Sequence, residues 1–185
     1  MLTHKGTQTI ETPRLILRRA VREDADAMFH NWASDPEVTK YLTWPTHESV
    51  AITEMVMKDW VDGYEKDDHY KWGVVLKDTG ELIGDISACY IYDDVCAAEI
   101  GYCMGKRWWG TGLMTEALKA VVDYFIGEVG MNRVCARHDV SNIGSGRVMQ
   151  KAGMTYEGTL RQSGRNNQGI VDLAHYSILK EEWKK

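Results

Sequence analysis

A glycine-containing loop between a strand pattern and a long helix pattern constrains this chain more than any other feature. The loop spans residues 106–112, with the sequence KRWWGTG, and the helix pattern runs from Gly112 through Ile126. Glycines at a helix N-terminus bring backbone N–H groups close to a phosphate, and the helix dipole attracts negative charge. The spacing Arg-x-x-Gly-x-Gly matches neither the dinucleotide fingerprint nor the P-loop. It predicts a pyrophosphate site of another kind, with Arg107 as an added positive charge.

Hydrophobic periodicity and turn residues predict a mixed α/β sheet around this loop. A short strand at 15–17 precedes two amphipathic helices, at 24–35 and 47–65. Three strands joined by turn sequences follow, at 72–77, 82–92 and 95–104. After the long helix we expect a strand at 133–137, a helix at 142–152, a strand at 154–160, a loop at 163–169 and a strand at 171–179. This order combines hairpins with βα units.

Length and charge narrow the class of protein. A chain of 185 residues suits one core, so we expect a single domain over residues 1–185. A net charge of -5 provides no electrostatic footprint for nucleic acid. No stretch reaches the roughly 20 apolar residues of a membrane helix, and the first ten residues show no signal-peptide core. The four cysteines lack metal-site spacing and are expected to be reduced thiols, so the sequence predicts a cytoplasmic protein without a metal.

Several segments, in the same linear order, resemble the GNAT superfamily of N-acetyltransferases. Arg107, Gly110 and Gly112 resemble the family's acetyl-CoA pyrophosphate loop, Gln/Arg-x-x-Gly-x-Gly/Ala. The run EIGY at 99–102 resembles its fourth strand, and 141–154 resembles its second acetyl-CoA segment. The opening run TPRLILR at 12–18 resembles the branch of RimJ/RimL-like ribosomal-protein N-terminal acetyltransferases. The resemblance extends from about residue 12 to about residue 183.

The resemblance implies a GNAT fold, with mostly antiparallel N-terminal strands and a splayed parallel pair formed by the family's fourth and fifth strands. Acetyl-CoA is then the co-substrate, no metal takes part, and pantetheine pairs with the backbone of the fourth strand. The fifth strand is Val134 to Ala136. The residues expected to bind the cofactor are Tyr102, Cys103, Met104, Arg107, Trp109, Gly110, Thr111, Gly112 and Asn142. Tryptophans in such loops also serve as packing or lid residues.

In this family an amine attacks the thioester directly, so the enzyme positions two substrates and moves protons. Glu99 is the candidate general base, or else a surface carboxylate paired with a cation. Ser145 is the candidate proton donor to the departing thiolate, or else a first-turn helical serine. Asn142 can cap a helix and contact pantetheine at once. Tyr156 and Tyr176 are expected to belong to the core or the cleft wall.

The resemblance implies a primary amine as acceptor, and its branch points to a protein N-terminal amine, as in the ribosomal-protein enzymes. One departure bears on that target, because the segment at 162–167 is QSGRNN where those enzymes carry an acidic residue. Two alternatives stay open. One is acetylation of a small amine such as a polyamine, an amino acid or an antibiotic, and the other is a non-catalytic acetyl-CoA sensor. We expect no nucleic acid or membrane partner, and a homodimer is compatible with the late strands.

Overall fold

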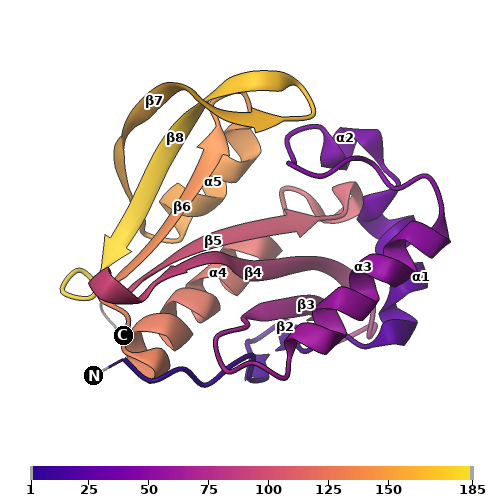
Figure 1. Ribbon diagram of the computed structural model, residues 1–185, viewed down its shortest axis with the longest axis horizontal. Helices are drawn as coiled ribbons and strands as arrows, with labels where there is room; N and C mark the ends of the chain where they lie inside the picture. The colour runs from indigo at the N-terminus through magenta and orange to yellow at the C-terminus, as the bar shows by residue number, and fades with distance from the viewer. Residues whose placement is uncertain (1, 184–185) are drawn as a thin grey trace.

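The computed structural model describes residues 2–183 as one eight-stranded sheet with helices on both faces (Figure 1). The strands are β1 (Ile10–Glu11), β2 (Leu15–Arg18), β3 (Lys71–Leu76), β4 (Leu82–Tyr92), β5 (Ala97–Met104), β6 (Arg133–Asp139), β7 (Thr155–Asn166) and β8 (Gly169–Leu179). The helices are α1 (Ala25–Met28), α2 (Pro36–Thr39), α3 (Val50–Gly63), α4 (Leu113–Tyr124) and α5 (Ile143–Lys151). Single 3-10 turns and two π-helical turns, Phe29–Ala33 and Phe125–Val129, extend or join these elements.

The sheet has the strand order β1-β2-β3-β4-β5-β6-β8-β7. Neighbouring strands are antiparallel except for β5 and β6, which run parallel. That parallel pairing is short, because only 97–99 pair with 133–135 before the two strands diverge. The expected mixed sheet with a splayed parallel pair is therefore confirmed. The gap between β5 and β6 opens beside the C-terminal half of β5.

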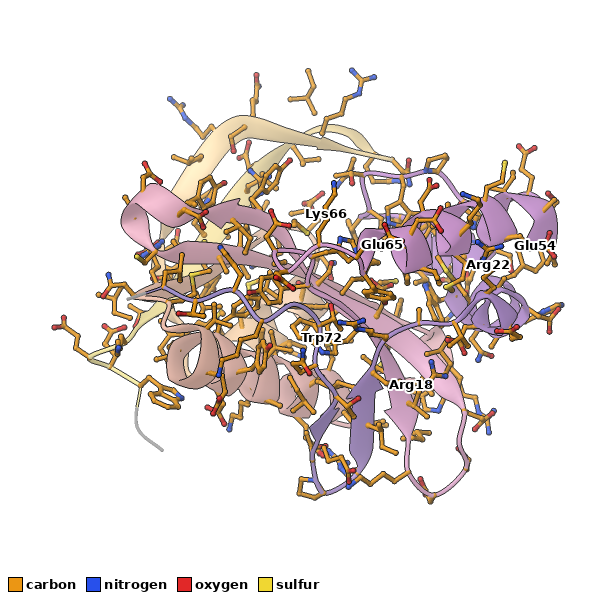
Figure 2. The ribbon with its side chains drawn as sticks, turned by 60° about the horizontal axis from the view of Figure 1, so that its bottom comes forward. Arg18, Arg22, Glu54, Glu65, Lys66 and Trp72 are labelled. Atoms are coloured by element: carbon orange, nitrogen blue, oxygen red, sulfur yellow. The ribbon has the colours of Figure 1, made fainter. Side chains whose placement is uncertain are left out.

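Two hydrophobic clusters hold the helices to the sheet. On one face, α4 buries Leu113, Ala117, Leu118, Val121 and Val122 against the sheet, which confirms the expected apolar stripe. Trp72 of β3 lies in the same cluster, and Figure 2 shows it well inside the molecule. On the other face, α1 and α3 cover β2–β4 with a second cluster. The face of β5, β6 and β8 that those two helices leave uncovered carries polar side chains.

The structure differs from the expected pattern at two places that later bear on the site. The helix expected to end at Asp35 ends at Ala33, and Asp35 is the N-cap of α2. Its carboxylate accepts the N–H of Glu37 at 2.8 Å, and Pro36 occupies the first turn. The loop expected at 163–169 is wrong: β7 continues to Asn166, and only 167–168 form the turn. Its polar residues belong to an edge strand with two bulges, and Gly169 supplies a positive φ of 106°.

Candidate active site

A cleft of about 650 Å³ lies where β5 and β6 diverge. Four segments form its walls: the end of β5, the loop and first turn of α4, the segment leading into α5, and the region of α2. The lining residues are Glu37, Val38, Tyr41, Leu42, Tyr102, Cys103, Met104, Trp108, Trp109, Gly110, Gly112, Leu113, Met114, Thr115, Ser141, Asn142, Ile143, Gly144, Ser145, Arg147, Val148 and Lys151. Segments from both ends of the domain therefore meet at one cavity.

The glycine loop enters the cleft with free backbone donors. Gly110 and Gly112 have φ values of 77° and 80°, and Gly112 is the residue before the first turn of α4. Within residues 2–183, the amides of Gly110, Thr111 and Gly112 donate to no acceptor. Three unpaired N–H groups at the N-terminus of a 12-residue helix are an arrangement suited to an anion.

Two residues of the turn between β1 and β2, outside the cleft, support the loop. Arg14 donates to the carbonyl oxygen of Thr111 at 3.2 Å and to the carboxylate of Glu116 at 2.7 Å. Thr12 bonds the same carboxylate at 2.6 Å, and these bonds together lower the pKa of Glu116 against the effect of its partial burial. The glycines therefore keep their left-handed conformations on a rigid base.

The other loop residues divide between cleft and exterior. Trp109 lines the cleft, and its indole N–H donates to the carbonyl oxygen of Met104 at 2.7 Å. Trp108 also contributes to the lining, but most of its side chain is buried in the core. Arg107 lies outside the cleft: its side chain is 72% exposed and pairs with Glu81 at 3.2 Å. Thr111 is also absent from the lining, and its hydroxyl donates to the carbonyl oxygen of Trp108 at 2.6 Å.

Tyr102 and Ser145 form a hydroxyl pair across the cleft. Tyr102 comes from β5, and its hydroxyl lies 3.0 Å from both the hydroxyl and the carbonyl oxygen of Ser145 on α5. Burial raises the pKa of Tyr102, so the phenol keeps its proton at neutral pH. Asn142 caps α5 as expected, because its side-chain oxygen accepts the N–H of Ser145 at 3.2 Å. The cap thereby orients the first turn that carries the serine.

Glu99 lies at the apex of the splay, on the opposite face of β5 from Tyr102, because neighbouring side chains of a strand alternate between faces. It does not line the cleft. Its carboxylate is 13% exposed and forms an ion pair with the guanidinium of Arg137 on β6, at 2.9 Å. This is the paired arrangement that the sequence left open, and it holds the carboxylate beside the gap.

Two groups of lining residues were not found from the sequence. Arg147 and Lys151 of α5 lie one helical turn apart and give the cleft positive charge. Their four-residue spacing, within the second cofactor-like segment at 141–154, was the available signal. The second group, Glu37, Val38, Tyr41 and Leu42, comes from α2 and the residues after it. No local pattern predicts that this segment crosses to the far end of the domain.

The other candidate residues from the sequence, two tyrosines and a cysteine, lie in the core, at the surface or in the cleft wall. Tyr176 is buried, and its hydroxyl accepts from Gln150 at 3.1 Å, while Tyr156 is half exposed and lies outside the cleft. Burial raises the pKa of Cys103, which keeps that lining residue a protonated thiol.

Across residues 2–183, no three His, Cys, Asp or Glu side chains converge as metal ligands do. No helix in this described part of the chain has the length and apolarity needed to cross a bilayer.

An open sheet that splays at one parallel pair, beside a glycine loop at a helix N-terminus, is the GNAT fold, and comparisons with known proteins agree. Residues 14–155 match the acetyltransferase (GNAT) domain family. The N-acetyltransferase p20 of Bacillus licheniformis is 31% identical over 95% of this chain and 98% of its own length. The chain therefore belongs to the GNAT acetyltransferase family and is an acetyltransferase.

Two further similarities concern ligands and substrates of other proteins. The Escherichia coli enzyme named ribosomal protein uS5-alanine N-acetyltransferase is 33% identical over 40% of this chain and 34% of its own length. The crystal structure of the microcin C7 self-immunity acetyltransferase MccE, in complex with acetyl-CoA and AMP, aligns with a TM-score of 0.81 at 21% identity. That alignment covers 96% of this chain and 98% of the other. At this identity it concerns the fold alone.

Proposed function

We propose that this enzyme binds acetyl-CoA in the cleft between β5 and β6 and transfers the acetyl group to the N-terminal amine of a protein or peptide. One observation carries the proposal: the free amides of the glycine loop and the Tyr102–Ser145 hydroxyl pair open into the same cleft. The first feature suits a pyrophosphate and the second suits a departing thiolate. A single extended thioester ligand uses both.

The cofactor is expected to follow the walls of the cleft. Its pyrophosphate takes the amides of 110–112, with Arg147 and Lys151 supplying positive charge nearby. Its pantetheine arm runs along the free edge of β5 at 102–104, where β6 has diverged, and meets Asn142 on the other side. Gly112 keeps the loop in the required conformation. In this arrangement Arg107 does not contact the pyrophosphate, and its positive charge attracts the cofactor only over a longer distance.

The proton transfers are assigned to the two faces of the gap. An amine attacks the thioester carbonyl carbon, the C–S bond breaks, and the sulfur departs as a thiolate. The carboxylate of Glu99 accepts the proton of the attacking amine through water. Ser145 gives its proton to the sulfur when Tyr102 donates to the serine hydroxyl oxygen, because the serine proton is then free. Base and acid thus act from opposite sides of β5.

The distribution of carboxylates favours a peptide N-terminus over a polyamine. A polyamine carries further ammonium groups that need acidic partners. On the face of Glu99, however, Asp85, Glu99 and Glu157 are each already paired, with Lys71, Arg137 and Arg133 respectively. In the cleft, Glu37 is paired with Lys106, and it is the single acidic residue among the described lining residues. The E. coli relative also acts, by its name, on a protein alanine.

The acceptor is tested with a synthetic decapeptide that has a free N-terminus and one internal lysine, with spermidine supplied in the same reaction. After incubation with acetyl-CoA, fragment-ion mass spectrometry reports the acetylated position. We expect the acetyl group on the α-amine of the peptide. Acetylation of spermidine or of the lysine side chain, with the α-amine unmodified, would contradict the proposed acceptor and leave the acetyl-transfer chemistry intact.

A further inference from the structure

The tip of the β7–β8 hairpin is tied to the segment after α2 by a single residue. The side-chain amide of Asn167 donates to the carbonyl oxygens of Thr39 and Trp44, at 2.9 and 2.8 Å. Its backbone N–H donates to the carbonyl oxygen of Leu42 at 3.2 Å. Figure 1 shows the hairpin curving toward the loop after α2. We call residues 39–44 the wall segment, and Asn167 bonds three of its carbonyl groups.

The wall segment has little structure of its own. After Thr39 it forms only turns and bends, and Leu42 N–H donates back to the carbonyl oxygen of Thr39 at 2.8 Å. Tyr41 and Leu42 nevertheless line the cleft. Leu42 packs on the second hydrophobic cluster, and the backbone of the segment is bonded by a residue more than 120 positions later in the chain.

The hairpin tip is in turn anchored to the opposite wall of the cleft. Asn166 donates from its side chain to the carboxylate of Asp139 at 2.8 Å, and the other oxygen of Asp139 accepts the N–H of Ser141 at 2.8 Å. Asp139 is 6% exposed, and Ser141 lines the cleft beside Asn142. Two neighbouring asparagines thus fix the distance between the wall segment and the segment that carries Ser145.

We propose that Asn167 is a specificity-determining positioning residue, which holds Tyr41 and Leu42 as the acceptor-facing wall of the cleft. This inference rests on the proposed function. The cofactor groups assigned above come from β5, the glycine loop and α5, and the wall segment belongs to none of these. The wall segment brings a ring and an aliphatic side chain, beside Val38, to a cleft whose charged residues other than Glu37 are basic. Such a wall selects an amine whose neighbouring carbon bears an apolar side chain.

The test compares Asn167→Ala with Gln168→Ala, a change at the same exposed tip that leaves every Asn167 bond in place. Two decapeptides serve as acceptors, identical except for an N-terminal leucine or aspartate. We expect the wild type and Gln168→Ala to prefer the leucine peptide at least tenfold in kcat/KM. Asn167→Ala should lose most of that preference through a higher KM for the leucine peptide, with its Kd for acetyl-CoA changed less than twofold.

Hydrogen exchange of the wall segment separates the ways this inference can fail. Faster exchange at 39–44 in Asn167→Ala alone is expected. Unchanged exchange would refute the tie, and faster exchange with an unchanged peptide preference would refute the specificity role. If the wild type binds acetyl-CoA but acetylates neither peptide, the proposed acceptor is wrong and the specificity role fails with it, while the exchange result still decides the tie.

Discussion

Replacement of Gly112 by valine is expected to raise the Kd for acetyl-CoA about 100-fold. Gly112 has a φ of 80°, and a β-branched side chain there costs more than the roughly 1–2 kcal/mol usual for a left-handed residue. The loop relieves this strain by changing its backbone conformation, and its amide N–H groups then no longer point toward the pyrophosphate. A hydrogen bond to a charged group contributes about 1.5–3 kcal/mol, so the loss of one or two accounts for the expected change. Isothermal titration calorimetry measures it.

Gly80→Val is the matched control for this substitution. Gly80 has a similar φ of 72°, in the turn between β3 and β4, and a Cβ atom placed there meets no heavy atom within 4 Å. The same backbone strain is therefore introduced away from the cleft. We expect both variants to lose a similar amount of thermal stability and Gly80→Val to keep its acetyl-CoA affinity. Equal affinities in the two variants would remove the glycine loop from the binding site.

Glu99→Gln and Ser145→Ala are each expected to lower kcat about 100-fold, at the low end of what a positioned acid or base contributes. The glutamine keeps the shape of the carboxylate but accepts no proton from the amine. The alanine leaves the thiolate without its nearby donor and leaves Tyr102 without one of its two partners. Both variants should bind acetyl-CoA with wild-type affinity. Initial rates of coenzyme A release, at saturating acetyl-CoA, measure the effect.

Glu157→Gln controls for the loss of an arginine-paired carboxylate. Glu157 bonds Arg133 and Ser177 across three strands, and the pairing lowers its pKa to about 2. It lies on the same sheet face as Glu99 but away from the gap. We expect this variant to be less stable and to retain its kcat. If Glu99→Gln turns over as fast as Glu157→Gln, Glu99 is an ion-pair partner of Arg137 and has no part in proton transfer.

Local patterns were sufficient for the parts of the site that lie on one stretch of chain. The apolar stripe of α4, the glycines before it and the cap at Asn142 each follow from residues a few positions apart. Those signals predict both the pyrophosphate loop and the position of Ser145 at the start of a helix. The mixed sheet followed from the order of hairpins and βα units, and the splayed pair was implied by the family resemblance.

What the sequence did not predict depends on contacts between distant segments. The direction of Arg107 is set by Glu81 on the β3–β4 side, and the pairing of Glu99 is set by Arg137 on the neighbouring strand. The wall segment is held beside the cleft by Asn167 and by packing on the second hydrophobic cluster. The stretch before Asn167 was predicted as a polar loop, because its pairing with β8 is a contact between strands that local composition does not indicate. Side-chain partners across a sheet or a cleft leave no local periodic signal.

The most direct test of acetyl transfer to an N-terminal amine is coenzyme A release by the wild type from acetyl-CoA, with the decapeptide ending in a free leucine amine. The same decapeptide with a formylated N-terminus serves as the blank, because it lacks only the attacking amine. Release that depends on the free amine, with one acetyl group found per peptide, is the result expected here. Equal release with both peptides, or none with either while acetyl-CoA still binds, would contradict the account.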